Sequence, residues 1–172
     1  EARCFRAWVN AHLLWCFGHF RTDDEYGILY KEELSDMVNV FRNRLNVKDS
    51  YQKIFDDLDA AIKDLGNYTT SKRLSRQLAQ ALKVKLLLNR GWEGDYANAL
   101  TLLNETIAGL PADFKMDPDM KKMYDDAWDS KEVLWARYLE DGSGQADEEY
   151  IRIGKTEFVL GKRGTRNTKI WQ

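Results

Sequence analysis

The chain has 172 residues, which is enough for one domain that buries roughly 70 % of the surface of its unfolded chain. Apolar residues make up 44 % and charged residues 31 %, so the composition is that of a globular protein and argues against disorder. The net charge of −2 argues against nucleic-acid binding, and we expect the basic residues of the segment 151–172 to form a solvated surface.

The sequence begins inside a helical pattern, without an N-cap or an initiator methionine, which predicts a fragment of a longer protein. The first helix is expected to end at Gly18. Its bulky side chains recur at the spacing of a buried helix face, which consists of Phe5, Trp8, Val9, His12, Leu13, Cys16 and Phe17.

The two cysteines, Cys4 and Cys16, lie roughly 18 Å apart if they share one helix, which is too far for a disulfide bond. We therefore expect both thiols to be free and buried. His12, Cys16 and His19 share a helix face at spacings that suggest a metal site. Because one helix spreads these side chains over two turns, we favour a core helix and expect neither metal nor cofactor.

Residues 19–49 predict an insertion with a partial helix over residues 31–45. A second helix follows, with Asp49 or Ser50 as its N-cap and an end at Gly66. Its predicted buried stripe is Tyr51, Ile54, Phe55, Leu58, Ile62 and Leu65. A third helix is predicted between a cap at Ser71 and Gly91, with a stripe of Leu74, Leu78, Ala81, Leu82, Leu86 and Leu87.

A fourth helix lies in "GDYANALTLLNETI" and repeats the second stripe with a shift of 45 positions. Its stripe is Tyr96, Ala99, Leu100, Leu103, Ile107 and Leu110. The first helix recurs in the third with a shift of 73, so two helical hairpins share one pattern. Gly94 permits a sharp turn and the small Ala99 permits close helix approach. This pattern is typical of tetratricopeptide repeats and predicts a mainly α fold, an α-α superhelix.

The chain changes character after Pro111. A loop and a short helix are predicted up to Asp126, followed by a strand-like run in "KEVLWARYL" and a possible second strand in "TEFVL". We therefore expect a short strand-bearing C-terminal segment.

Four sequence blocks resemble the SusD/RagB family of nutrient-uptake proteins, in the family's order. "EARCFRAWVNAHLLWCFG" resembles the family helix that carries Glu-Ala-Arg and Arg-Ala and ends in Phe-Gly, and "YQKIFDDLDAAIKDL" resembles the next helix, with its Asp-Leu and Ala-Ile pairs. "SRQLAQALKVKLLLNRG" with "GDYANALTLLNETI" resembles the family's tetratricopeptide hairpin, and "DSKEVLWARY" its Ser-x-Glu-Val-Ile-Phe segment. The Pro-containing stretch that follows Phe-Gly in the family is absent here.

The resemblance covers residues 1–140 and implies a tetratricopeptide-like repeat region of a much longer protein, with 141–172 as an unassigned tail of the same domain. It further implies a non-catalytic lipoprotein on the outer membrane of Bacteroidetes-type bacteria. Such a protein captures glycan or peptide nutrients and passes them to a TonB-dependent, SusC-like transporter. The lipid anchor, the only membrane contact, would then precede this chain, because neither cysteine fits it.

Aromatic rings commonly stack on sugar faces in glycan-binding proteins, so aromatic residues in loops are the candidate ligand contacts. They are Trp92, Trp128, Tyr26 and Tyr30, and packing under a loop is the alternative for each. Replacement of Trp92 by Ala is expected to weaken ligand binding with little change in thermal stability. Trp8, Trp15 and Trp135 are expected in the core.

Other function classes are less consistent with the sequence. The neighbours in the pairs Asp56/Asp57 and Asp125/Asp126 diverge by about 100° on a helix, so they cannot flank one glycosidic bond. No serine-hydrolase, phosphate-loop or zinc-protease motif occurs, and we expect that the protein is not an enzyme. The alternative is a tetratricopeptide-like adaptor that binds a protein or peptide partner in its groove.

Overall fold

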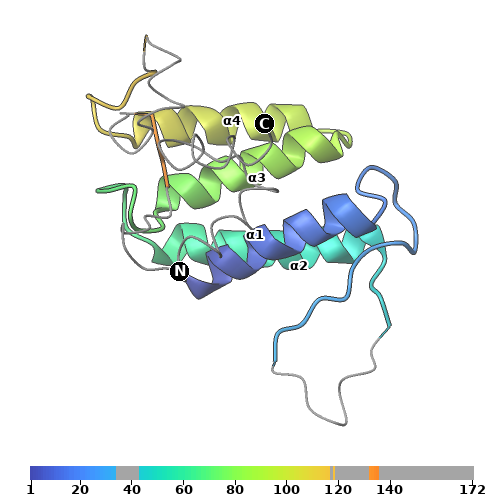
Figure 1. Ribbon diagram of the computed structural model, residues 1–172. Helices are drawn as coiled ribbons and strands as arrows, with labels where there is room; N and C mark the ends of the chain where they lie inside the picture. Colours follow the sequence, from blue (N-terminus) through green and yellow to red (C-terminus); the bar gives the residue numbers. More distant parts are fainter. Residues whose placement is uncertain (34–42, 117, 119–131, 136–172) are drawn as a thin grey trace, which may run out of the picture. The chain divides into compact units, whose positions relative to one another are not determined.

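The computed structural model describes residues 1–33, 43–116, 118 and 132–135. Within these residues it forms four helices and no strand, which confirms the predicted mainly α class (Figure 1). The helices are α1 (Ala2–Phe17), α2 (Val47–Asp64), α3 (Arg76–Arg90) and α4 (Asp95–Ala108). None of the helices in this described part is both long and apolar enough to cross a membrane.

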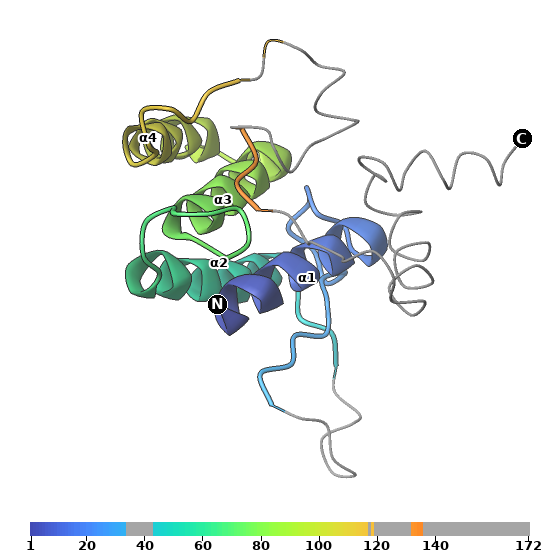
Figure 2. The same ribbon diagram turned by 60° about the vertical axis from the view of Figure 1, so that its left-hand side comes forward.

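The helices form two hairpins, because α1 packs against α2 and α3 packs against α4. The hairpins meet mainly through α2 and α3, as Figure 2 shows. All four helices belong to one compact unit, which comprises Glu1–Thr69 and Leu74–Leu110. A second unit comprises Thr70–Arg73 and Pro111–Gln172. The predicted domain boundary after residue 140 lies outside the described residues.

Helix α1 ends before Gly18 as predicted, but its predicted buried face is wrong. The side chains that pack into the core are Cys4, Ala7, Ala11 and Leu14, whereas Phe5, Val9, Leu13, Cys16 and Phe17 are exposed. Small residues on the inner face let the α1 backbone approach its neighbour closely, which bulky side chains would prevent. Trp8, His12 and Trp15 are partly buried, and Trp15 packs against the core.

The predicted stripe of α2 is confirmed. Tyr51, Ile54, Phe55 and Leu58 are buried, while Ile62 and Leu65 are partly buried against the core. The helix begins earlier than predicted, because Asn46 is its N-cap. The Asn46 side chain accepts a hydrogen bond of 2.6 Å from the backbone N–H of Asp49, which satisfies one of the free donors of the first turn.

The insertion between α1 and α2 is closed at its neck. The N–H of Gly27 donates to the Leu45 carbonyl at 3.1 Å, and the N–H of Leu45 donates to the Ile28 carbonyl at 2.9 Å. The predicted helix over residues 31–45 is absent from its described ends, 31–33 and 43–45, and its middle lies outside the described residues. Ile28 and Tyr30 of this segment are buried.

Helix α3 begins with Ser75 as its cap rather than Ser71, and it ends at Gly91 as predicted. Ser75 accepts a hydrogen bond of 3.2 Å from the N–H of Leu78. Leu86 and Leu87 are buried, and Leu74 and Leu82 are partly buried against the core. Gly91 and Gly94 have φ angles of 66° and 82°, so both ends of the turn use a backbone conformation that favours glycine.

The predicted stripe of α4 is only partly correct. Ala99 is buried at the helix crossing as expected, but Tyr96, Leu100, Leu103 and Ile107 are exposed. The described residues of the predicted strand "KEVLWARYL", 132–135, are not in a strand, and Trp135 is partly buried. The predicted short helix before Asp126, the second strand and the basic tail lie almost wholly outside the described residues.

Candidate functional site

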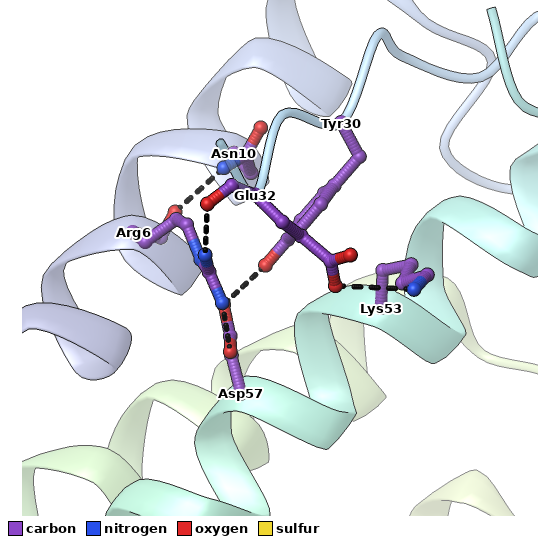
Figure 3. A network of polar contacts seen from close by, with 6 residues as sticks. All are labelled: Arg6, Asn10, Tyr30, Glu32, Lys53 and Asp57. Atoms are coloured by element: carbon purple, nitrogen blue, oxygen red, sulfur yellow. Dashed lines mark hydrogen bonds and ion pairs between the residues drawn. The ribbon is translucent and has the colours of Figure 1, made fainter. Parts of the chain in front are cut away.

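A polar network joins α1, α2 and the insertion around the carboxylate of Asp57 (Figure 3). Nε and Nη2 of Arg6 on α1 each donate to one carboxylate oxygen of Asp57 on α2, both at 2.6 Å. The hydroxyl of Tyr30, from the insertion, donates to the same carboxylate at 2.5 Å. The network extends outward, where Lys53 forms an ion pair of 3.1 Å with Glu32.

The electrostatics of this network favour a fixed ion pair. Burial raises the pKa of Asp57, but the hydrogen bonds from Arg6 and Tyr30 outweigh that effect and hold the pKa below its ordinary value. Burial and the Asp57 carboxylate raise the pKa of the Tyr30 hydroxyl. Asp57 therefore stays ionised and Tyr30 stays protonated at neutral pH. This arrangement of Arg6, Tyr30 and Asp57, which we call the Asp57 clamp, is better suited to holding the helices together than to transferring a proton.

A second cluster surrounds Arg90 at the end of α3. Its guanidinium donates to Asp95 at 2.8 and 2.6 Å, and the N–H of Trp92 donates to the same carboxylate at 2.8 Å. These bonds hold the pKa of Asp95 low, although burial alone raises it. The guanidinium also lies over the rings of Tyr51, Phe55 and Trp92, with distances to the ring centres of 5.1, 4.9 and 4.5 Å.

Trp92 connects the second hairpin to the first. Its indole Nε1 donates to the carbonyl of Arg21 at 2.9 Å, and its ring meets the Tyr51 ring edge-on at 6.0 Å. The Tyr51 hydroxyl donates to the carbonyl of Phe20 at 2.7 Å. Trp92 is thus partly buried and fixes the segment after α1 to the core, while its candidacy as a ligand contact stays a prediction.

The predicted ligand residues take part in separate contacts. Tyr30 is only 7 % exposed and belongs to the Asp57 network, so its ring offers little surface for stacking. Tyr26 is 48 % exposed and packs against the His19 ring at 4.8 Å. Trp128 lies outside the described residues. Tyr26 is therefore the described candidate whose ring is most accessible to a sugar.

No three His, Cys, Asp or Glu side chains of the described segments are arranged to hold a metal ion. His12 contacts the carbonyl of Trp8 at 2.9 Å, and His19 contacts Asp24 at 2.8 Å. The cysteines are free as predicted, but only Cys4 is buried, and Cys16 is exposed. Burial raises the pKa of Cys4 to about 11, which makes this thiol unreactive.

The structure assigns roles to residues that sequence reasoning did not select. Asp57 binds Arg6, whereas the neighbouring Asp56 accepts a hydrogen bond from Gln52, so the two carboxylates do not form one site. The pair Asp125/Asp126 lies outside the described residues. The signal for the clamp was present in the resembling blocks, because Arg6-Ala7 and Asp57-Leu58 are their Arg-Ala and Asp-Leu pairs.

Comparisons of the chain with family models, with curated proteins and with solved structures found no match.

Proposed function

We propose that the chain is the repeat-bearing scaffold of a SusD/RagB-type surface lipoprotein, which binds glycan nutrients and delivers them to a TonB-dependent outer-membrane transporter. In this proposal the two hairpins belong to a tetratricopeptide-like superhelix. The protein acts by binding and release rather than by turnover.

The main support is that the resembling blocks meet at one clamp. Arg6 of the first block forms the bidentate ion pair with Asp57 of the second. Ala7 and Leu58, which follow them in the sequence, are both fully buried. The Arg-Ala and Asp-Leu pairs of the resembling blocks thus contribute to the contact between α1 and α2 in this chain.

The second hairpin adds a parallel observation. Arg90 and Asp95 close the turn between the two blocks that resemble the family's repeat hairpin. Gly94 takes the left-handed conformation that the tight turn requires, and Ala99 is buried at the crossing with α3. These features support the proposal of a stacked repeat scaffold, on which binding residues are carried by loops.

Within the described residues, the ligand would meet the segment between α1 and α2. This segment carries the exposed Tyr26, whose backbone N–H is fixed by Asp24 at 2.9 Å. The Tyr26 ring also packs against the His19 ring at 4.8 Å, and a ring that is already positioned loses little conformational entropy when a sugar stacks on it. Trp92 lies at the same segment through its contact with Arg21 and would report binding by its fluorescence.

The test is a tryptophan-fluorescence titration of the 172-residue chain with starch, xylan, host-type glycans and peptides. We expect saturable binding of one glycan, at least tenfold weaker in Tyr26→Ala and unchanged in the matched control Tyr96→Ala, an exposed tyrosine on α4. A tenfold loss corresponds to about 1.4 kcal/mol. Equal binding by both variants would remove Tyr26 from the site. A chain that binds no glycan, but binds a defined peptide partner, would favour the adaptor instead.

A further inference from the structure

The segment after α1 begins with a short loop, residues 19–26, that is closed on itself and tied to the helices. The N–H of His19 donates to the Tyr26 carbonyl at 3.0 Å, so the two ends of the loop lie side by side. Three other carbonyls of the loop accept hydrogen bonds from α2 and from the turn after α3. The acceptors are Phe20, Arg21 and Asp24, and their donors are Tyr51, Trp92 and Val47. A loop held at so many points presents its exposed side chains in fixed positions.

Two exposed rings lie together where the loop closes. The centres of the His19 and Tyr26 rings are 4.8 Å apart, and the rings are tilted by 50°. Tyr26 is 48 % exposed, and 59 % of the His19 side chain is exposed. An aromatic face beside a hydrogen-bonding ring nitrogen matches the two surfaces of a sugar, which are its C–H face and its rim of hydroxyls.

Asp24 determines which nitrogen of His19 is presented. Oδ2 of Asp24 lies 2.8 Å from Nδ1 of His19, and the same carboxylate accepts hydrogen bonds from the Thr22 hydroxyl and the Tyr26 N–H. The bonds from His19 and Tyr26 hold the pKa of Asp24 below its ordinary value, so the carboxylate is ionised at neutral pH and can only accept. Nδ1 of His19 therefore carries a proton, and Nε2 is the nitrogen that can meet a ligand.

We propose that His19 and Tyr26 form one subsite for a neutral sugar, which stacks on the Tyr26 ring and places a hydroxyl against Nε2 of His19. This inference rests on the proposed function, because it names the class of glycan that is bound at Tyr26. Asp24 already accepts three hydrogen bonds, so it is a positioning residue that acts through His19. The subsite is built from the loop 19–26 alone.

The chemistry of the loop favours a hydroxyl over a negatively charged group. A hydroxyl both donates and accepts, so it pairs with Nε2 of a neutral or a protonated imidazole, whereas a carboxylate or sulfate pairs only with the protonated ring. Arg21 is the one arginine or lysine of the loop, and Arg44 binds the Phe17 carbonyl nearby in the neck. The acidic residues of the loop outnumber these two arginines and are Asp23, Asp24 and Glu25. Their excess charge repels uronic acids and sulfated sugars.

Titration of the 172-residue chain with matched oligosaccharides, followed by tryptophan fluorescence, tests the sugar class. Maltohexaose, xylohexaose and chitohexaose are the neutral probes, and hexagalacturonate is the anionic one. We expect one neutral probe to bind at least about tenfold more tightly than hexagalacturonate. Asp23→Asn/Glu25→Gln removes two of the charges and should reduce that preference to less than about threefold.

Variants of His19 test the hydrogen bond from the sugar. His19→Phe keeps a ring against Tyr26 but removes both nitrogens, and it should weaken binding of the neutral probe about tenfold. His19→Gln places an amide where Nε2 can be replaced, and it should recover most of that loss. Circular dichroism establishes that each variant is folded.

Nitrogen NMR of the unmodified chain separates a direct contact from a structural role. We expect His19 to carry its proton on Nδ1, and we expect the bound sugar to shift the Nε2 resonance of His19. His12, the other histidine of the chain, is the internal control, and its resonances should not move. Asp24→Asn should populate the other tautomer of His19 and weaken binding.

The outcomes distinguish this inference from the proposed function. A neutral probe that binds without moving the His19 resonances, or hexagalacturonate that binds as tightly as the neutral probes or more tightly, overturns the inference and leaves glycan binding in place. A chain that binds none of the oligosaccharides overturns both.

Discussion

The two hairpins use the same pair of residue types in different places. In the first hairpin, Arg6 and Asp57 join α1 to α2 across the long connection 18–46, and Tyr30 of that connection adds a third bond. In the second, Arg90 and Asp95 lie at the two ends of the short turn 91–94. A short turn keeps two helices antiparallel by itself, so the ion pair between Arg90 and Asp95 only fixes the turn. A long connection does not, so the first hairpin needs an ion pair between its helices.

The hairpins also differ in how far their second helices are covered. Leu58 of α2 is fully buried, but Leu103, its equivalent in α4, is substantially exposed. The two residues occupy the same place in the repeated pattern. The same position of the pattern is thus buried in one hairpin and exposed in the other, and this matched pair allows the contribution of burial to be measured.

The largest expected effect comes from that matched pair. Leu58→Ala should lower the free energy of unfolding by about 4 kcal/mol, because it leaves a cavity in a packed core. Leu103→Ala should cost no more than about 1 kcal/mol, since much of the side chain already faces solvent. Urea unfolding followed by circular dichroism measures both. Equal losses would mean that the Leu103 side chain is buried in the folded chain in solution.

The Asp57 clamp should rank second. Asp57→Ala is expected to cost about 3 kcal/mol, because it leaves the Arg6 guanidinium and the Tyr30 hydroxyl without their shared acceptor. The control is Asp56→Ala, next to it on the exposed side of α2, which should change the stability by less than about 0.5 kcal/mol. If the two variants unfold at the same urea concentration, the network does not hold the first hairpin together.

The same clamp predicts a dependence on pH. The pKa of Asp57 is lower in the folded chain than in the unfolded chain, so the unfolded chain takes up a proton more readily. The stabilisation that ionised Asp57 provides is complete above the ordinary carboxyl pKa of about 3.9. It is lost as the pH falls through the pKa that Asp57 has in the folded chain. Thermal melting between about pH 6 and pH 2 should show a smaller acid-induced loss in Asp57→Ala than in the wild-type chain. Superimposable profiles would assign the loss to other carboxylates, including Asp95.

Trp92 should have an intermediate effect. Trp92→Ala is expected to cost about 2 kcal/mol, less than a fully buried tryptophan, because the ring is only partly buried. Trp92→Phe keeps a ring beneath Arg90 but loses the hydrogen bond to Arg21, and should cost about 1 kcal/mol. Urea unfolding measures both. The sequence alone predicted unchanged stability for Trp92→Ala, and a stable alanine variant with weakened glycan binding would restore that interpretation.

The sequence predicted the helices better than their inner faces. Glycine positions located the helix ends at Gly18 and Gly91 correctly, although only Gly91 takes the left-handed conformation by which glycine commonly ends a helix, and Gly18 is extended. The spacing of leucine and aromatic residues chose the wrong face of α1, since a helix with apolar residues on two sides has two possible buried faces. The small residues Ala7 and Ala11 mark the true one, because they allow close packing.

The candidate site was less accessible to sequence reasoning. Arg6 and Asp57 are separated by 51 positions, and no local pattern indicates which charged side chains meet across a hairpin. Burial of Tyr30 follows from the neck of the insertion, which again depends on contacts between distant residues. The resembling blocks contained both clamp residues, but as motif letters without a physical role.

Substitutions at the start of α2 are expected to have the smallest effect on the free energy of unfolding. They test whether the Asn46 cap or the neck of the insertion holds the first turn of this helix. Asn46→Ala removes the side-chain cap and should cost about 1 kcal/mol, while Asn46→Gly should cost only a few tenths of that. Helix α4 begins after Gly94 without a side-chain cap, so Gly94→Asn, which tolerates the left-handed conformation, should be nearly neutral. Urea midpoints resolve these differences. If Asn46→Ala is also neutral, the start of α2 is held by the neck, where the N–H of Val47 donates to the Asp24 carbonyl at 2.8 Å, rather than by its cap.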